Sequence, residues 1–193
     1  MTEINQKLEN LYNPLVDNFE AFSSELIELI FNPEAINNTN KFASLLVLLK
    51  RSEFVNPLLK KISSGNKGDF WLTDFLYAAS GLLDECSEDE EFDVPKNIVF
   101  KLDEWVVNNT GQLSWYAACL LKFYESESAE KIQLKKLGQR GDFFLAYVEC
   151  LLGLLRFHRD KYLPLVQEIA NDETRDEKLI EFCRDVIKNE SGK

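Results

Sequence analysis

The sequence has 193 residues, a net charge of −11 and 45% hydrophobic residues, which include 14 Phe, 6 Tyr and 3 Trp. So many aromatic residues supply a hydrophobic core and exclude intrinsic disorder, and no run of about 18 apolar residues is present to span a membrane. The negative charge argues against nucleic acid as a direct ligand, because binding to phosphates needs an excess of Lys and Arg. It favours either a basic partner or simply high solubility.

Composition also indicates one domain in a reducing compartment. Glycine (8) and proline (5) are scarce and no segment reads as a linker, so we expect a single domain over residues 1–193. The polar start of the chain, Met1 to Leu11, lacks the apolar segment of a secretory signal. Four cysteines are scattered singly, which is typical of reduced thiols: Cys86, Cys119, Cys150 and Cys183. We therefore expect a cytoplasmic protein.

Apolar residues recur at helical spacing through the first half of the chain. After a short N-terminal helix, Asn13-Pro14 restarts the chain, and a helix is predicted from there to Asn32-Pro33. Further helices are predicted over 41–50, with its N-cap among residues 37–40, and from Ser52 to Ile62. The composition of 63–68 predicts a loop. Asp69 is then the expected N-cap of a helix that ends near Asp84.

The second half continues the same pattern. Pro95 opens a helix, and helices near 112–124 and 128–137 follow. Asp142 is the expected cap of a helix that ends near Phe157, where a polar turn leads into a helix over 161–170. Thr174 and Glu177 have the spacing of a capping box for the last helix. Because alternation typical of strands is nearly absent, we expect an all-α fold of about nine or ten helices.

A short pattern repeats within these helices. Tyr77, Tyr116 and Tyr147 each precede a small residue by three positions, and they are separated by 39 and 31 residues. A stack of helix pairs needs small residues where neighbouring backbones come close, and periods of this length are those of helical solenoids. The sequence therefore predicts stacked antiparallel helix pairs, although it carries no consensus of a known repeat family.

The sequence contains little that could perform catalysis. His158 is the only histidine and lies between two predicted helices, so zinc sites and metal hydrolases that need paired histidines are excluded. No phosphate-binding glycine loop or nucleophile motif is present. We expect no catalytic residue, no metal and no cofactor. The basic residues Lys131, Lys135, Lys136 and Arg140 are expected on the solvent face of an amphipathic helix, with contact to RNA as the alternative.

The densest chemical feature is an acidic segment, residues 84–93, in which seven of ten residues are acidic and none is basic. A solvated charged loop is the usual fate of such a run. A surface for a basic partner is the second possibility, and its expected binding residues are Asp84, Glu85, Glu88, Asp89, Glu90, Glu91, Phe92 and Asp93. The third is a divalent-metal site.

The metal alternative depends on two patterns. The arrangement of Asp84, Glu85, Glu88 and Asp89 resembles the aspartate-rich motif of helical prenyl-diphosphate enzymes, which implies Mg²⁺ and diphosphate binding. Glu-x-x-Glu pairs at Glu25/Glu28 and Glu127/Glu130 resemble those of all-α nucleotide pyrophosphatases. These likenesses keep a Mg²⁺-dependent enzyme as an alternative function.

Two binding functions stand beside it. The first is a small acidic inhibitor, of the kind that gives a bacterium immunity to a toxin, which would cover the active site of a basic nuclease with residues 84–93. The second is an adaptor that binds a protein segment through aromatic residues on the inner surface of the stack. Neighbouring aromatic residues cannot all face one way on a helix, which favours such a surface: Phe70-Trp71, Trp115-Tyr116 and Phe143-Phe144.

Overall fold

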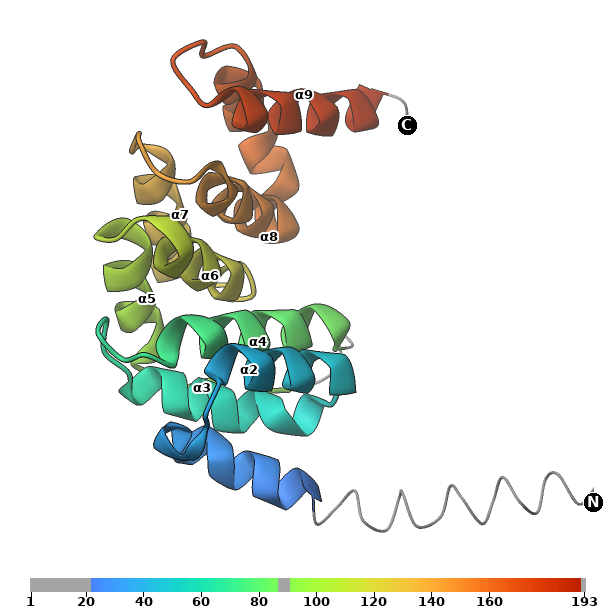
Figure 1. Cartoon of the computed structure of the whole chain (residues 1–193). Coiled ribbons are helices and arrows are strands. Elements are labelled where there is room, and N and C mark those ends of the chain that lie inside the picture. The colour runs from blue at the N-terminus through green and yellow to red at the C-terminus, as the bar shows by residue number, and fades with distance from the viewer. Residues whose placement is uncertain (1–21, 87–90, 192–193) are drawn as a thin grey trace, which may run out of the picture.

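The structure is a computed structural model that describes residues 22–86 and 91–191 (Figure 1). The described residues form helices and connecting turns and contain no strand, which confirms the all-α prediction. The predicted break at Asn13-Pro14 lies outside them. A helix over residues 22–31 is followed by η1 Pro33–Ala35, α2 Thr39–Leu49, η2 Ser52–Phe54, α3 Val55–Ser64, α4 Leu72–Glu85, α5 Ile98–Val107, α6 Gly111–Leu121, α7 Glu127–Leu137, α8 Phe144–Ala170 and α9 Glu177–Ser191.

These helices stack in two layers. In the first layer, α2 packs on α4, α4 on α6, α6 on α8 and α8 on α9. The second layer contains α3, α5 and α7, which pack beneath α4, α6 and α8 respectively. Figure 1 shows the resulting column of helix pairs, which rises from the N-terminal to the C-terminal end of the described chain. The predicted stack of antiparallel helix pairs is thereby confirmed.

The long helix α8 is two helices of this pattern joined at one residue. His158 has non-helical backbone angles (φ −139°, ψ 52°), which divide α8 where the sequence predicts a helix end. Before the kink, Glu149 pairs with Lys122 at the end of α6, and beyond it Lys161 pairs with Glu130 of α7. The first half of α8 therefore belongs to the first layer, and its second half belongs to the second layer.

Contacts between equivalent helix ends define the repeat. At the helix starts, Thr39 Oγ1 donates to Asp74 Oδ2 over 2.5 Å. At the helix ends, Lys50 Nζ lies 2.7 Å from Glu85 Oε2. Because the start of α2 contacts the start of α4 and the end of α2 contacts the end of α4, these first-layer helices run parallel, as successive units of a solenoid do. The small residues of the repeated pattern pack inside the stack: Ser80, Cys119 and Cys150 are all buried.

Four predicted details of capping and exposure are wrong. Lys136 is buried and not on a solvent face, because its ammonium pairs with Asp142. Asp142 does not cap its own helix, since the N-cap of α8 is Phe143; its Oδ1 accepts instead from Gly111 N, at the start of α6, over 2.7 Å.

The third is the capping box of the last helix. The helix α9 begins only at Glu177, so Thr174 lies in the preceding turn, where its hydroxyl donates to Asp172. The Asp176 carboxylate accepts from Lys178 N over 2.9 Å instead. The predicted cap within 37–40 is confirmed as Asn38, which accepts from Lys41 N. Trp71, not Asp69, precedes α4 as its N-cap.

Candidate functional site

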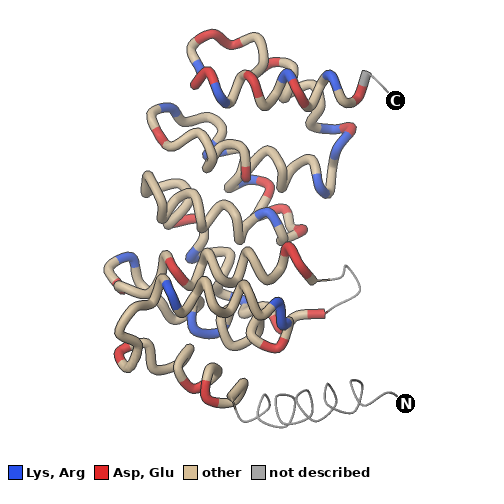
Figure 2. Tube along the Cα trace, turned by 45° about the vertical axis from the view of Figure 1, so that its right-hand side comes forward, with Lys and Arg blue, Asp and Glu red and all other residues tan. Residues whose placement is uncertain are grey.

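The first part of the acidic segment is tied to neighbouring helices. Asp84 and Glu85 end α4, where negative charge is unfavourable because it adds to the negative end of the helix dipole. Lys122 Nζ lies 3.1 Å from Asp84 Oδ2, and Lys50 pairs with Glu85. In Figure 2, acidic residues mark this end of α4, with basic residues close by. Both predicted binding residues are therefore half-exposed and already paired within the chain.

The rest of the segment divides into two parts. Glu88, Asp89 and Glu90 lie outside the described residues. Phe92 is half-buried and packs against the hydrophobic core of its own chain, and Asp93 N donates to Asn56 of α3. Glu91 and Asp93 expose their side chains to solvent. Of the described residues of this segment, these two carboxylates are the ones that remain free of ion pairs.

Partly exposed aromatic rings cross the first layer instead. The Tyr77 ring of α4 lies 5.5 Å from the Tyr116 ring of α6, measured between centroids. Tyr116 stacks on Trp115 at 4.5 Å, and Trp115 meets Phe143 edge-on at 5.4 Å. Phe143 lies 5.3 Å from Phe144 at the start of α8. We call these five residues the aromatic stripe; it connects three successive helix pairs.

Two groups extend the stripe with polar chemistry. At the α8 end, Lys178 Nζ of α9 lies 5.3 Å from the centre of the Phe144 ring. Within the stripe, Trp115 Nε1 is buried and has no hydrogen-bond partner in the described part of the chain. Phe143 is 42% exposed, so a bound segment can still bury much of its ring.

Sequence reasoning identified the residue pairs of the stripe but not their order in space. Trp115-Tyr116 and Phe143-Phe144 were expected on the inner surface because adjacent residues of a helix face different ways. Tyr77 joins them only through the contact of α4 with α6. Four further aromatic residues are core residues and are not available to a partner: Trp71, Phe75, Trp105 and Tyr147 are buried, although Phe70, next to Trp71, is exposed.

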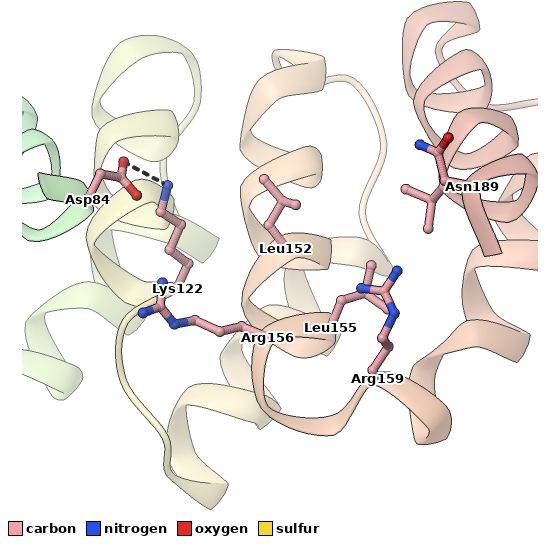
Figure 3. A pocket seen from close by; sticks show the side chains of 8 residues that line it. Asp84, Lys122, Leu152, Leu155, Arg156, Arg159 and Asn189 are labelled. Carbon is pink, nitrogen blue, oxygen red and sulfur yellow. Dashed lines mark hydrogen bonds and ion pairs between the residues drawn. The ribbon is translucent and has the colours of Figure 1, made fainter. Parts of the chain in front are cut away.

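A polar groove lies at the other end of the first-layer helices. Its volume is about 390 Å³, and Figure 3 shows the residues that line it: Asp84, Lys122, Leu152, Leu155, Arg156, Arg159, Val186 and Asn189. Lys122 lies between Asp84 and Glu149, each 3.1 Å away. The Arg156 guanidinium stacks over Phe123 at 5.0 Å. Because these cations lie at the ends of α6 and of the first half of α8, they complement helix dipoles, and Lys122 is also neutralised by carboxylates.

Two ionisable groups beside this groove, Lys122 and Cys119, have raised pKa values. Burial opposes protonation of Lys122, but the charges of Glu149 and Asp84 outweigh it and raise the pKa of Lys122. Burial and the neighbouring Glu149 raise the pKa of the Cys119 thiol well above its usual range. Both groups therefore keep their protons near neutral pH, and a protonated thiol is a poor nucleophile.

Of the two Glu-x-x-Glu pairs that suggested a metal site, Glu25 and Glu28 are exposed on the first described helix, whereas Glu127 and Glu130 are engaged with cations. Glu127 pairs with Lys131, and Glu130 pairs with Lys161 and accepts from the Tyr162 hydroxyl. His158 Nε2 lies 3.7 Å from Glu130 as well. Among the residues that the structure describes, no three His, Cys, Asp or Glu side chains lie together as metal ligands would. The aromatic stripe is therefore the candidate site with the most accessible binding chemistry.

No helix in the described ranges combines the length and the apolar character needed to cross a bilayer. Comparison of the chain with models of protein families, with curated proteins and with solved structures finds no match.

Proposed function

We propose that this protein is a non-catalytic helical-repeat domain that binds a protein segment along the aromatic stripe. The observation that carries the proposal is the unbroken contact of five partly exposed rings across α4, α6 and α8. Large aromatic side chains dominate binding energy at protein interfaces, because they bury much area at little cost in conformational entropy. Helical solenoids commonly present such surfaces to protein ligands.

A capture experiment with paired variants tests this function. The purified protein is immobilised and exposed to an extract of its native host, with Trp115→Ala and Phe143→Ala combined as the test variant. Two exposed leucines away from the stripe, Leu48 and Leu134, give the control when both are changed to Ala. We expect the test variant to capture about tenfold less of the partner than the unchanged protein, and the control to capture the same amount. Equal capture by both variants would reject the proposal.

A second candidate function is inhibition of a basic partner through the acidic segment, as an immunity-type protein would do in the cytoplasm. Its support is the net charge of −11 and the exposure of Glu91 and Asp93. The four cysteines are scattered singly along the sequence, which agrees with a reducing compartment. An acidic surface accelerates association with a basic nuclease and would then cover its active site.

Association kinetics separate this candidate from the first. Changing Glu88, Asp89, Glu90 and Glu91 to lysine should slow association with the captured partner and weaken its dependence on salt concentration. The Trp115 and Phe143 variants would change mainly the dissociation rate, since buried apolar contacts act there. An unaltered association rate in the lysine variant would dismiss the inhibitor hypothesis.

A further inference from the structure

A separate groove lies in the second layer, between α5 and α7. It has a volume of about 410 Å³, and its apolar lining consists of Val99 and Phe100 from α5 and Ile132 from α7. On α7 the lining residues run from 128 to 135, so the groove follows the helix for two turns, or about 10 Å. This length suits a few extended residues of a bound chain.

One aromatic ring in this groove is exposed to solvent. Phe100 is 76% exposed, while Val99 beside it is half-buried and packs against the core. Ile132 is buried at the opposite side of the groove. The groove therefore combines an apolar lining with one large side chain that only an external group can cover.

The charge of the groove is opposite to that of the protein. Its rim carries Lys96, Lys131 and Lys135 against one acidic residue, Asp103, in a chain with a net charge of −11. Lys131 pairs with Glu127, but both side chains are more than 70% exposed. Lys135 lies 3.7 Å from Asp103, also in solvent, and exposed pairs of this kind are weak. These ammonium groups can therefore exchange their partners for incoming carboxylates.

The chain itself shows which occupant suits this layer. Residues 91–97 lie along α3: Asp93 N donates to Asn56 Oδ1 over 2.8 Å, and Asn97 Nδ2 donates to Ser63 O over 3.0 Å. Phe92, between Glu91 and Asp93, packs into the core from this segment. An extended segment with an aromatic residue flanked by carboxylates thus already covers part of the second layer, one helix before the groove.

We infer that the groove between α5 and α7 binds a short acidic segment of a protein partner, with a large apolar side chain against Phe100 and carboxylates at Lys96, Lys131 and Lys135. This site is independent of the aromatic stripe, because it belongs to the other layer of the stack. Charge complementarity selects the segment, and the apolar lining holds it.

The test uses the full chain and a fluorescein-labelled peptide with one phenylalanine between two pairs of glutamates. Fluorescence anisotropy is measured at low salt. Combined Lys131→Glu and Lys135→Glu changes are expected to weaken binding by about tenfold, since two attractions become repulsions. Phe100→Ser should weaken binding without altering the charge. The matched control combines Lys41→Glu with Lys67→Glu, two exposed lysines outside the groove, and should change affinity by less than about twofold.

Three results would overturn the assignment. The first is an equal loss of affinity in both lysine double variants, which would mean unspecific charge attraction. The second is undiminished binding of a peptide with lysines in place of glutamates. The third is self-association, measured by sedimentation equilibrium, that Phe100→Ser abolishes, because the occupant would then be a second copy of this chain.

Discussion

Lys136 Nζ lies 2.5 Å from Asp142 Oδ2, and neither side chain is more than 2% exposed. The pair joins α7 to the residues that precede α8. Asp142 also accepts hydrogen bonds from Gly111 N of α6 and from Phe143 N. Phe143 belongs to the aromatic stripe, so this buried pair holds one of its rings in place.

We expect Lys136→Met to destabilise the protein strongly. Removing one partner of a buried pair leaves the other charge uncompensated, which costs about 3–5 kcal/mol. Urea unfolding measures the loss. Lys135→Met is the matched control, since the neighbouring lysine lies 59% exposed and should leave the free energy of unfolding nearly unchanged. Equal effects of the two changes would contradict the role given to the pair.

The same pair predicts a dependence of stability on pH. Burial of the Asp142 carboxyl favours its neutral form, but hydrogen bonds from Lys136 and from two backbone N–H groups outweigh burial and lower its pKa below 3.8. A lowered pKa contributes stability above the unfolded value, and this contribution disappears as the pH falls through the folded value. The free energy of unfolding should therefore drop below about pH 4, and Asp142→Asn should show a smaller drop over the same range. Parallel curves for the two proteins would refute this.

A glycine of α8 should not tolerate a side chain. A Cβ at Gly153 would lie 2.1 Å from Gln133 Nε2 and 3.0 Å from Lys122 Cα, so α8 approaches both α6 and α7 at this point. Alanine favours a helix by about 1 kcal/mol, yet overpacking here should give a net destabilisation of about 1–3 kcal/mol. Thermal unfolding measures it, with Gly68→Ala as a control where a Cβ meets no atom within 4 Å.

The cysteines should differ sharply in reactivity. Burial raises the pKa of Cys150 to about 12 and that of Cys183 to about 11, and it raises the pKa of Cys119 as well. Cys86 is half-buried, whereas these three are buried. Iodoacetamide should therefore modify Cys86 first in the native protein, and mass spectrometry of Cys86→Ser should show slow labelling overall. Fast modification of Cys150 would show that the stack opens readily.

Local patterns in the sequence predict most of this fold, because helix periodicity and turn residues act over a few positions. The end of a helix near Phe157 was predicted from its polar neighbours, and the kink at His158 confirms it. Lys136 was misplaced for the opposite reason. Its sequence neighbours resemble those of the exposed Lys135, and its partner Asp142 comes close only in the folded stack.

In the candidate site too, local patterns predict some features, whereas others depend on how the helices pack. Adjacent aromatic residues such as Trp115 and Tyr116 reveal a surface that a helix cannot bury on one face. Their contact with Tyr77 depends on how closely α4 and α6 pack, which no local pattern encodes. Phe92 was predicted to meet a partner because it stands among acidic residues, whereas its ring packs against the core of its own chain. Whether the acidic segment also binds a partner stays a prediction.

The column of helix pairs has a mechanical consequence. Within their layer, the first-layer helices from α2 to α9 pack on their neighbours. The stability of the stack is therefore the sum of its helix pairs and of the interfaces between neighbours. The aromatic stripe crosses two of these interfaces, between α4 and α6 and between α6 and α8. A segment bound along the stripe would contact all three helix pairs at once. These pairs could otherwise unfold one after another, and with the segment bound they would unfold together.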